Sequence, residues 1–117
     1  MPRNILIVDD SLFQRNQIVK TVKELFETID QAQDGAEALS KAKQSDYDMI
    51  ITDLVMPNMD GLQFLKELRK TKQTPVIVIT ADIQEPVKQE CVSYGVKAFV
   101  NKPFKPDELI NILRNSI

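Results

Sequence analysis

The chain has 117 residues, 43% of them hydrophobic and 27% charged, with 3 glycines and 6 prolines. This length and composition predict one folded domain and exclude a disordered, collagen-like or low-complexity chain. The 15 basic and 17 acidic residues leave a net charge of −2, so no basic surface is available for non-specific nucleic-acid binding.

Two residue types limit the chemistry further. Histidine is absent, which excludes Ser/His and Cys/His nucleophilic pairs and histidine-ligated zinc. The single cysteine, Cys91, cannot form an intrachain disulfide, and no apolar stretch reaches the roughly 20 residues of a membrane span. We therefore expect residues 1–117 to form one domain in the reducing cytoplasm, away from membranes.

Short apolar runs predict the strands of this domain, and they cover residues 5–8, 29–32, 49–51, 76–79 and 98–100. Unbroken apolar runs are typical of strands that helices cover on both faces. The second run is more polar, since it contains Asp30 and Gln31, and this favours an edge position.

Apolar residues at helical spacing lie between and after these runs. The four inner helices are predicted from Ile18, Val22, Leu25 and Ile29; from Ala36, Leu39 and Ala42; from Leu62, Leu65 and Leu68; and from Val87, Cys91 and Tyr94. Pro86 suits a first turn and Gly95 a C′ position, and a last helix is expected to begin near Pro106. The alternation predicts an open parallel α/β sheet with right-handed crossovers.

Polar side chains follow most of these strands. Asp9 and Asp10 follow the first, Asp53 the third, Thr80 the fourth and Lys102 the fifth. Functional groups of open α/β sheets gather at the carboxyl ends of the strands. If the first strand lies beside the third, the three carboxylates meet within several ångströms.

Such a cluster needs compensating charge. Two unit charges about 4 Å apart repel by roughly 4 kcal/mol at an effective dielectric of 20. Lys102 leaves the three acids at −3 + 1 = −2, which a divalent cation would balance. Oxygen ligands favour Mg²⁺, with Mn²⁺ as an alternative, and protonation of one carboxylate is the competing solution.

A metal beside a carboxylate, a lysine and a hydroxyl is typical of phosphoryl transfer. We interpret Asp53 as the nucleophile because it ends a central strand ahead of an open loop, residues 54–60. The other roles are metal binding for Asp9, Asp10 and the Val55 carbonyl, and phosphoryl binding for Thr80 and Lys102. Several of these residues also have a purely structural interpretation. Asp10 or Ser11 could cap the first helix, Lys102 could be a solvated surface lysine, and Thr80 could be present for its strand propensity.

Five segments in this order carry a family resemblance: residues 5–11 (ILIVDDS), 34–39 (DGAEAL), 53–61 (DLVMPNMDG), Thr80-Ala81 and Lys102-Pro103-Phe104. Over nearly its whole length the chain resembles the receiver domain of bacterial two-component response regulators. The resemblance implies a flavodoxin-like five-stranded parallel sheet of order 2-1-3-4-5 with five helices on both faces.

The resemblance also implies a phosphorylation switch. A sensor histidine kinase would donate a phosphoryl group to Asp53 with Mg²⁺ bound, and the domain would promote its own phosphorylation and slow dephosphorylation as a signalling protein, not as an enzyme. Asp10, Asp53 and the Val55 carbonyl would contact the metal directly, and Asp9 partly through water.

By the same resemblance, Thr80 and Lys102 move onto the phosphoryl oxygens and Phe99 is the switch aromatic that turns inward. The face formed by the fourth helix, fifth strand and fifth helix would then report the state to a target. A core aromatic with no motion is the alternative for Phe99. Val55 and Asp82 occupy positions that tune the phosphoryl lifetime.

We therefore expect a stand-alone, monomeric, chemotaxis-type phosphoacceptor, with dimerisation on activation left open. Three alternatives differ in class. A phosphatase of the haloacid-dehalogenase type expects an Asp-x-Asp pair, whereas Asp9 and Asp10 are adjacent. A flavodoxin-like FMN carrier would not begin its phosphate loop with two carboxylates. The chain could also be a receiver excised from a longer regulator. Kinase, target and phosphoryl lifetime stay open.

Overall fold

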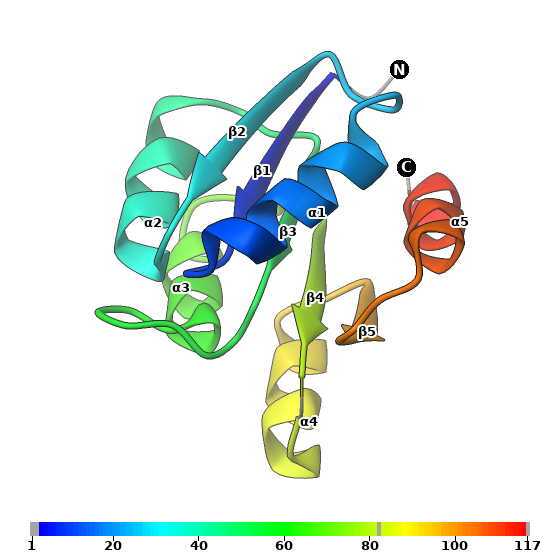
Figure 1. Ribbon diagram of the computed structural model, residues 1–117. Coiled ribbons are helices and arrows are strands. Elements are labelled where there is room, and N and C mark those ends of the chain that lie inside the picture. Colours follow the sequence, from blue (N-terminus) through cyan, green and yellow to red (C-terminus); the bar gives the residue numbers. More distant parts are fainter. Residues whose placement is uncertain (1–2, 82, 117) are drawn as a thin grey trace.

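The computed structural model describes residues 3–81 and 83–116, so Asp82 lies outside the described residues. Strands and helices alternate along the chain (Figure 1). Their bounds are β1 (Asn4–Val8), α1 (Leu12–Val22), β2 (Thr28–Ala32), α2 (Gly35–Gln44), β3 (Met49–Thr52), α3 (Gly61–Leu68), β4 (Val76–Thr80), α4 (Glu85–Ser93), β5 (Ala98–Asn101) and α5 (Pro106–Ser116).

The strands form one sheet of order β2-β1-β3-β4-β5, and every neighbouring pair is parallel. This confirms the predicted flavodoxin-like sheet and its edge strand β2. The order places β1 beside β3, with Val8 opposite Thr52. The residues that follow these two strands, Asp9 and Asp53, are therefore neighbours at the end of the sheet where the parallel strands have their carboxyl ends.

Side chains alternate between two apolar cores, one on each face of the sheet. Leu6 and Val8 of β1 pack with α2, α3 and α4, whereas Ile5 and Ile7 pack with α1 and α5. Because both faces are buried, β1, β3 and β4 carry almost unbroken apolar runs. The expectation of helices on both faces is confirmed (Figure 1).

One predicted helix is longer than the observed one. The spacing of Ile18, Val22, Leu25 and Ile29 extended the predicted helix into the strand predicted at residues 29–32. The observed α1 ends at Val22, and Ile29 lies in β2 as the strand prediction had it. Leu25 and Ile29 nevertheless pack on the same core as α1. The apolar spacing therefore continued across a turn and into a strand, and periodicity alone could not separate the two.

The other helix ends agree with their sequence signals. Gly95 has φ of 81° directly after the C-cap residue Tyr94 of α4, a backbone conformation that glycine adopts without steric cost. Ser11 caps α1 by accepting a hydrogen bond from the Gln14 N–H at 3.2 Å. Within residues 3–81 and 83–116, no helix combines the length and apolar character that a bilayer crossing needs.

Candidate functional site

The carboxylates of Asp9, Asp10 and Asp53 converge at the carboxyl ends of β1 and β3. One oxygen from each side chain lies within 4.8 Å of the corresponding oxygens of the other two. Asp9 and Asp53 are buried, whereas Asp10 is exposed at the rim. The convergence follows from the strand order, since β1 and β3 are hydrogen-bonded neighbours that end together.

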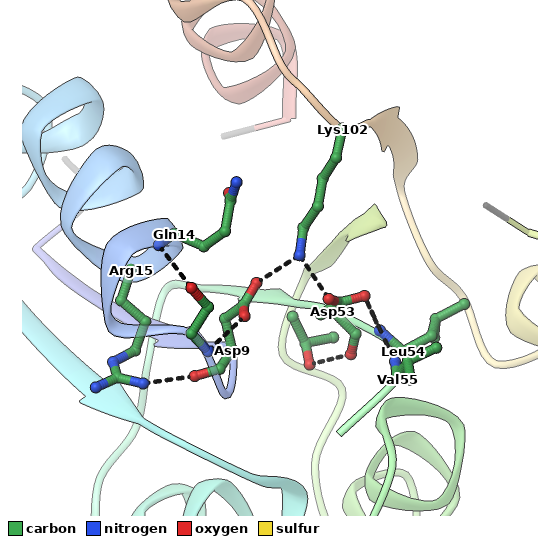
Figure 2. Close-up of polar contacts among 9 residues, drawn as sticks. Asp9, Gln14, Arg15, Asp53, Leu54, Val55 and Lys102 are labelled. Atoms are coloured by element: carbon green, nitrogen blue, oxygen red, sulfur yellow. Dashed lines mark hydrogen bonds and ion pairs between the residues drawn. The ribbon is translucent and has the colours of Figure 1, made fainter. Parts of the chain in front are cut away.

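Lys102 joins two of these acids across the sheet edge. Its Nζ donates to Asp53 Oδ2 at 2.6 Å and to Asp9 Oδ2 at 2.9 Å (Figure 2). The lysine follows β5, and its backbone N–H donates to the Thr80 carbonyl at 2.9 Å. Burial opposes the charge on Lys102, but the hydrogen bonds to Asp53 and Asp9 outweigh it and raise the lysine pKa.

Each polar group of Asp9 has a partner. Its N–H donates to the Ala32 carbonyl, its Oδ1 accepts from the Ser11 N–H at 2.9 Å, and its carbonyl accepts from Arg15 Nη1 at 2.7 Å. Burial is the largest influence on this carboxyl and raises its pKa, despite the opposing hydrogen bonds from Ser11 and Lys102. The site therefore holds Asp9 in a fixed orientation at a cost in charge solvation.

Asp53 is held by the loop that follows it. Its Oδ1 accepts a hydrogen bond from the Leu54 N–H at 2.6 Å, so both of its oxygens have donors (Figure 2). The chain then returns, and the Gly61 N–H donates to the Leu54 carbonyl at 2.9 Å. A Cβ on Gly61 would lie 2.2 Å from the Asp53 carbonyl oxygen, so only glycine permits this approach.

The remaining predicted site residues lie on β4, β5 and the loop after β3. Thr80 ends β4 and is buried, and Val55 is 75% exposed two residues after Asp53. Phe99 in β5 is half-buried against the core of α2, α3 and α4. The Nζ of Lys88, from α4, lies 5.4 Å from the centre of the Phe99 ring, within the range of a cation–π contact.

The donor set fits a hard divalent cation. Three carboxylates offer oxygen ligands from one small volume, and Mg²⁺ is commonly held by one or two carboxylates together with water and phosphate oxygens. The exposed position of Asp10 leaves room for such additional ligands. When bound, Mg²⁺ would neutralise charge on the acids and on a transferring phosphoryl group.

Sequence reasoning missed two residues, one that contacts the site and one in the loop after Asp53. Arg15 binds the Asp9 carbonyl from α1, and Asn58 donates to Asp34 at 2.9 Å, with φ of 67° in the loop after Asp53. Arg15 lies four residues after the cap Ser11, so helical spacing places it one turn from the strand end. No comparable local signal joins Asn58 to Asp34, which is 24 residues away.

Comparison with known proteins agrees with this geometry. The profile of the response regulator receiver domain matches residues 5–114. The chain belongs to the response regulator receiver domain family. Receiver domains generally act as signalling proteins and not as enzymes, so this membership favours a phosphoacceptor over the phosphatase and the FMN carrier.

Relatives of this receiver domain differ in length. It is 34% identical to the chemotaxis protein CheY of Bacillus subtilis, over 100% of this chain and 99% of that protein. It is also 34% identical to the transcriptional regulatory protein ResD of B. subtilis and 39% identical to SrrA of Staphylococcus aureus, but spans only 44% and 46% of their lengths.

Solved structures show the same fold. The chemotaxis protein CheY4 of Vibrio cholerae aligns over 100% of both chains with a TM-score of 0.90 and 33% identity. A chain of the CheX–CheY–BeF3–Mg²⁺ complex from Borrelia burgdorferi aligns with a TM-score of 0.90 and 34% identity, over 98% of this chain and 89% of that chain.

Proposed function

We propose that this receiver domain is a Mg²⁺-dependent phosphoacceptor in two-component signalling and that Asp53 is the residue phosphorylated. The observation that carries the proposal is the convergence of the Asp9, Asp10 and Asp53 carboxylates beside Lys102. Membership of the receiver family supports it, as does the likeness to a chain of the CheX–CheY–BeF3–Mg²⁺ complex.

In the proposed step, an Asp53 carboxylate oxygen attacks the phosphorus of a phosphohistidine on a sensor histidine kinase or phosphotransfer protein. A P–O bond forms, the P–N bond breaks, and the electron pair stays on the imidazole nitrogen. Residues 1–117 cannot supply this phosphohistidine themselves, because they contain no histidine. The Leu54 N–H, 2.6 Å from Asp53 Oδ1, orients the carboxylate for attack.

Asp9, Asp10, Asp53 and the Val55 carbonyl are the proposed metal ligands, with Mn²⁺ as a substitute for Mg²⁺. Lys102 then has two successive partners. Before transfer its ammonium neutralises Asp9 and Asp53 at 2.9 and 2.6 Å, and after transfer it binds a phosphoryl oxygen. Thr80, which ends the neighbouring strand β4, supplies a hydroxyl to another phosphoryl oxygen.

The proposed output is a change at the α4–β5–α5 face. Movement of Thr80 toward the phosphoryl group would vacate space beside β5 and allow the Phe99 ring to turn inward. The contact of Lys88 with Phe99 connects this ring to α4, so the ring position would alter the surface that a downstream protein binds. Phe99 is half-buried, which is compatible with an inward or outward ring.

We assign the domain to chemotaxis-type signalling in the cytoplasm, as a monomer that binds a protein target and neither nucleic acid nor membrane. Support comes from the alignment with CheY of B. subtilis along 99% of that protein. The matches to ResD and SrrA, over less than half of each, support the second possibility of a receiver within a longer transcriptional regulator.

Incubation with acetyl phosphate tests the central claim. With Mg²⁺, intact-mass spectrometry should show one added phosphoryl group, and EDTA should prevent it. Asp53→Asn should abolish the addition, whereas Asp60→Asn, which changes an exposed acid that caps α3, should retain it. An unmodified wild-type mass, or a phosphoryl group retained by Asp53→Asn, would refute the assignment.

A further inference from the structure

We infer that Arg15 is a positioning residue for the metal site, and that it acts by holding the peptide between Asp9 and Asp10. This inference rests on the proposed function, because it concerns how the same acids are oriented toward Mg²⁺. The Arg15 side chain bonds the main-chain carbonyl of Asp9 and not the carboxylates that are the predicted metal ligands.

The hydrogen bonds of Arg15 place it across the turn that carries both acids. Its Nη1 donates to the Asp9 carbonyl at 2.7 Å, and its Nε donates to Gln31 Oε1 in β2 at 2.9 Å. Its backbone N–H donates to the carbonyl of the cap Ser11 at 3.0 Å. One residue therefore joins the end of β1, the start of α1 and the edge strand.

The Asp9 carbonyl belongs to the peptide that continues into Asp10. Holding this carbonyl determines the orientation of the peptide plane and therefore the direction in which the exposed Asp10 leaves the strand. Asp9 itself is held by Lys102, Ser11 and Ala32. Arg15 supplies the contact on the other side, and Figure 2 shows it approaching Asp9 from the side opposite Lys102.

Two physical effects of Arg15 on a bound cation have opposite signs. Its positive charge repels Mg²⁺, so electrostatics alone predict tighter Mg²⁺ binding after the charge is removed. Its hydrogen bond orients the ligands, so positioning predicts weaker binding after its removal. Loss of an outer partner of a metal ligand typically weakens metal affinity by about 10- to 100-fold, which identifies positioning as the larger effect.

The test compares Arg15→Met with Gln31→Met. Arg15→Met retains much of the apolar stem but removes both hydrogen bonds. Gln31→Met removes only the bond between α1 and β2 and leaves Arg15 free to bind the Asp9 carbonyl. Arg15 is half-exposed and lines a surface hollow of about 260 Å³, so its replacement creates no sealed cavity and the variant should fold.

Mg²⁺ affinity is measured by titrating MgCl2 into labelled protein and following backbone amide signals by NMR. We expect Arg15→Met to bind Mg²⁺ about tenfold more weakly and Gln31→Met to bind it as wild type does. Arg15→Lys, which retains a donor and the charge, should recover part of the affinity. This partial recovery separates positioning from a general loss of α1 packing.

Equal or tighter binding by Arg15→Met would overturn the inference, and so would an equal loss in both methionine variants. If Arg15→Met failed to fold, wild-type affinity in Arg15→Lys would contradict the inference and weakened affinity would support it. Absence of Mg²⁺ binding by the wild type would instead refute the proposed function, so the two failures are distinguishable.

Discussion

Lys102→Met should destabilise this receiver domain by an amount that depends on pH and on Mg²⁺. The substitution keeps an unbranched side chain but removes the ammonium that binds Asp9 and Asp53 at 2.9 and 2.6 Å. Asp9 and Asp53, whose oxygens lie within 4.8 Å of each other and of an Asp10 oxygen, then lose their shared cation. At that separation each charged pair repels by about 3.5 kcal/mol at an effective dielectric of about 20.

The expected loss at pH 7 is smaller than this repulsion. Removing one partner from a fully buried ion pair costs about 3–5 kcal/mol. The Lys102 side chain is 16% exposed, and the exposed rim lets water screen part of the charge. We therefore expect the free energy of unfolding to fall by about 2 to 3 kcal/mol without Mg²⁺, as measured by urea denaturation.

Acid and Mg²⁺ should both reverse this loss. Burial already raises the pKa of Asp9, and Lys102 opposes that rise, so the variant should hold the Asp9 proton to higher pH. A folded-state pKa above the unfolded value means that stability increases as the pH falls through the folded pKa, and the gain is complete below the ordinary value of 3.8. Saturating Mg²⁺ at pH 7 should have the same effect by binding only the folded state.

Lys105→Met is the matched control, because it removes the same charge from an exposed position three residues away. It should change the stability little at any pH. If Lys102→Met lost no more stability than Lys105→Met at pH 7, carboxylate repulsion would not be what Lys102 relieves. A gap that persisted unchanged at acidic pH or in Mg²⁺ would refute the reasoning equally.

Three further substitutions test the surrounding structure by urea denaturation. Asp34→Ala should lower the free energy of unfolding by about 1 to 2 kcal/mol. The Glu37 N–H and then the Asn58 amide lower the pKa of Asp34. The stabilisation by Asp34 is therefore complete above the ordinary pKa of 3.8 and is lost as the pH falls through the lowered pKa. Gly61→Ala should lose about 3 kcal/mol and slow phosphorylation by acetyl phosphate, since its Cβ meets the Asp53 carbonyl oxygen at 2.2 Å. Phe64→Ala should lose about 3 to 5 kcal/mol, because Phe64 is fully buried.

Each of these has a contrary result. A pH-independent loss in Asp34→Ala would mean that packing, not the ionised cap, stabilises α2. Wild-type stability in Gly61→Ala would show that the loop after Asp53 can move aside. A loss below about 1 kcal/mol in Phe64→Ala would show that the core collapses around the vacated space.

Where apolar spacing and residue preference indicated the same secondary structure, the predicted element was correct. The predicted run 76–79 is apolar and β-branched, and β4 covers it and ends one residue later, at Thr80. At the end of α1 the signals conflicted, since Leu25 and Ile29 continue a helical spacing although Ile29 lies in β2. Both residues face one core, and burial of a side chain does not reveal the backbone conformation that presents it.

The candidate site was predictable because strand ends are visible in the sequence. Asp9 directly follows an apolar run, and Asp53 and Lys102 each follow one after a single polar residue. Parallel strands bring their carboxyl ends to the same end of the sheet. The residues that contact these three were harder to predict from the sequence. Arg15 reaches a carbonyl and Gly61 permits a close backbone approach, and neither contact depends on a charge pattern that a sequence displays.

The sequence by itself determined the class of sheet, the absence of imidazole chemistry and the set of acids available for a cation, because periodicity and composition are properties of the chain. Only the tertiary structure decided which oxygens converge, that Lys102 shares its ammonium between Asp9 and Asp53, and that Arg15 holds the peptide between two acids. These contacts join residues up to 93 positions apart. Their distances arise from how β1, β3 and β5 pack, which no local pattern specifies.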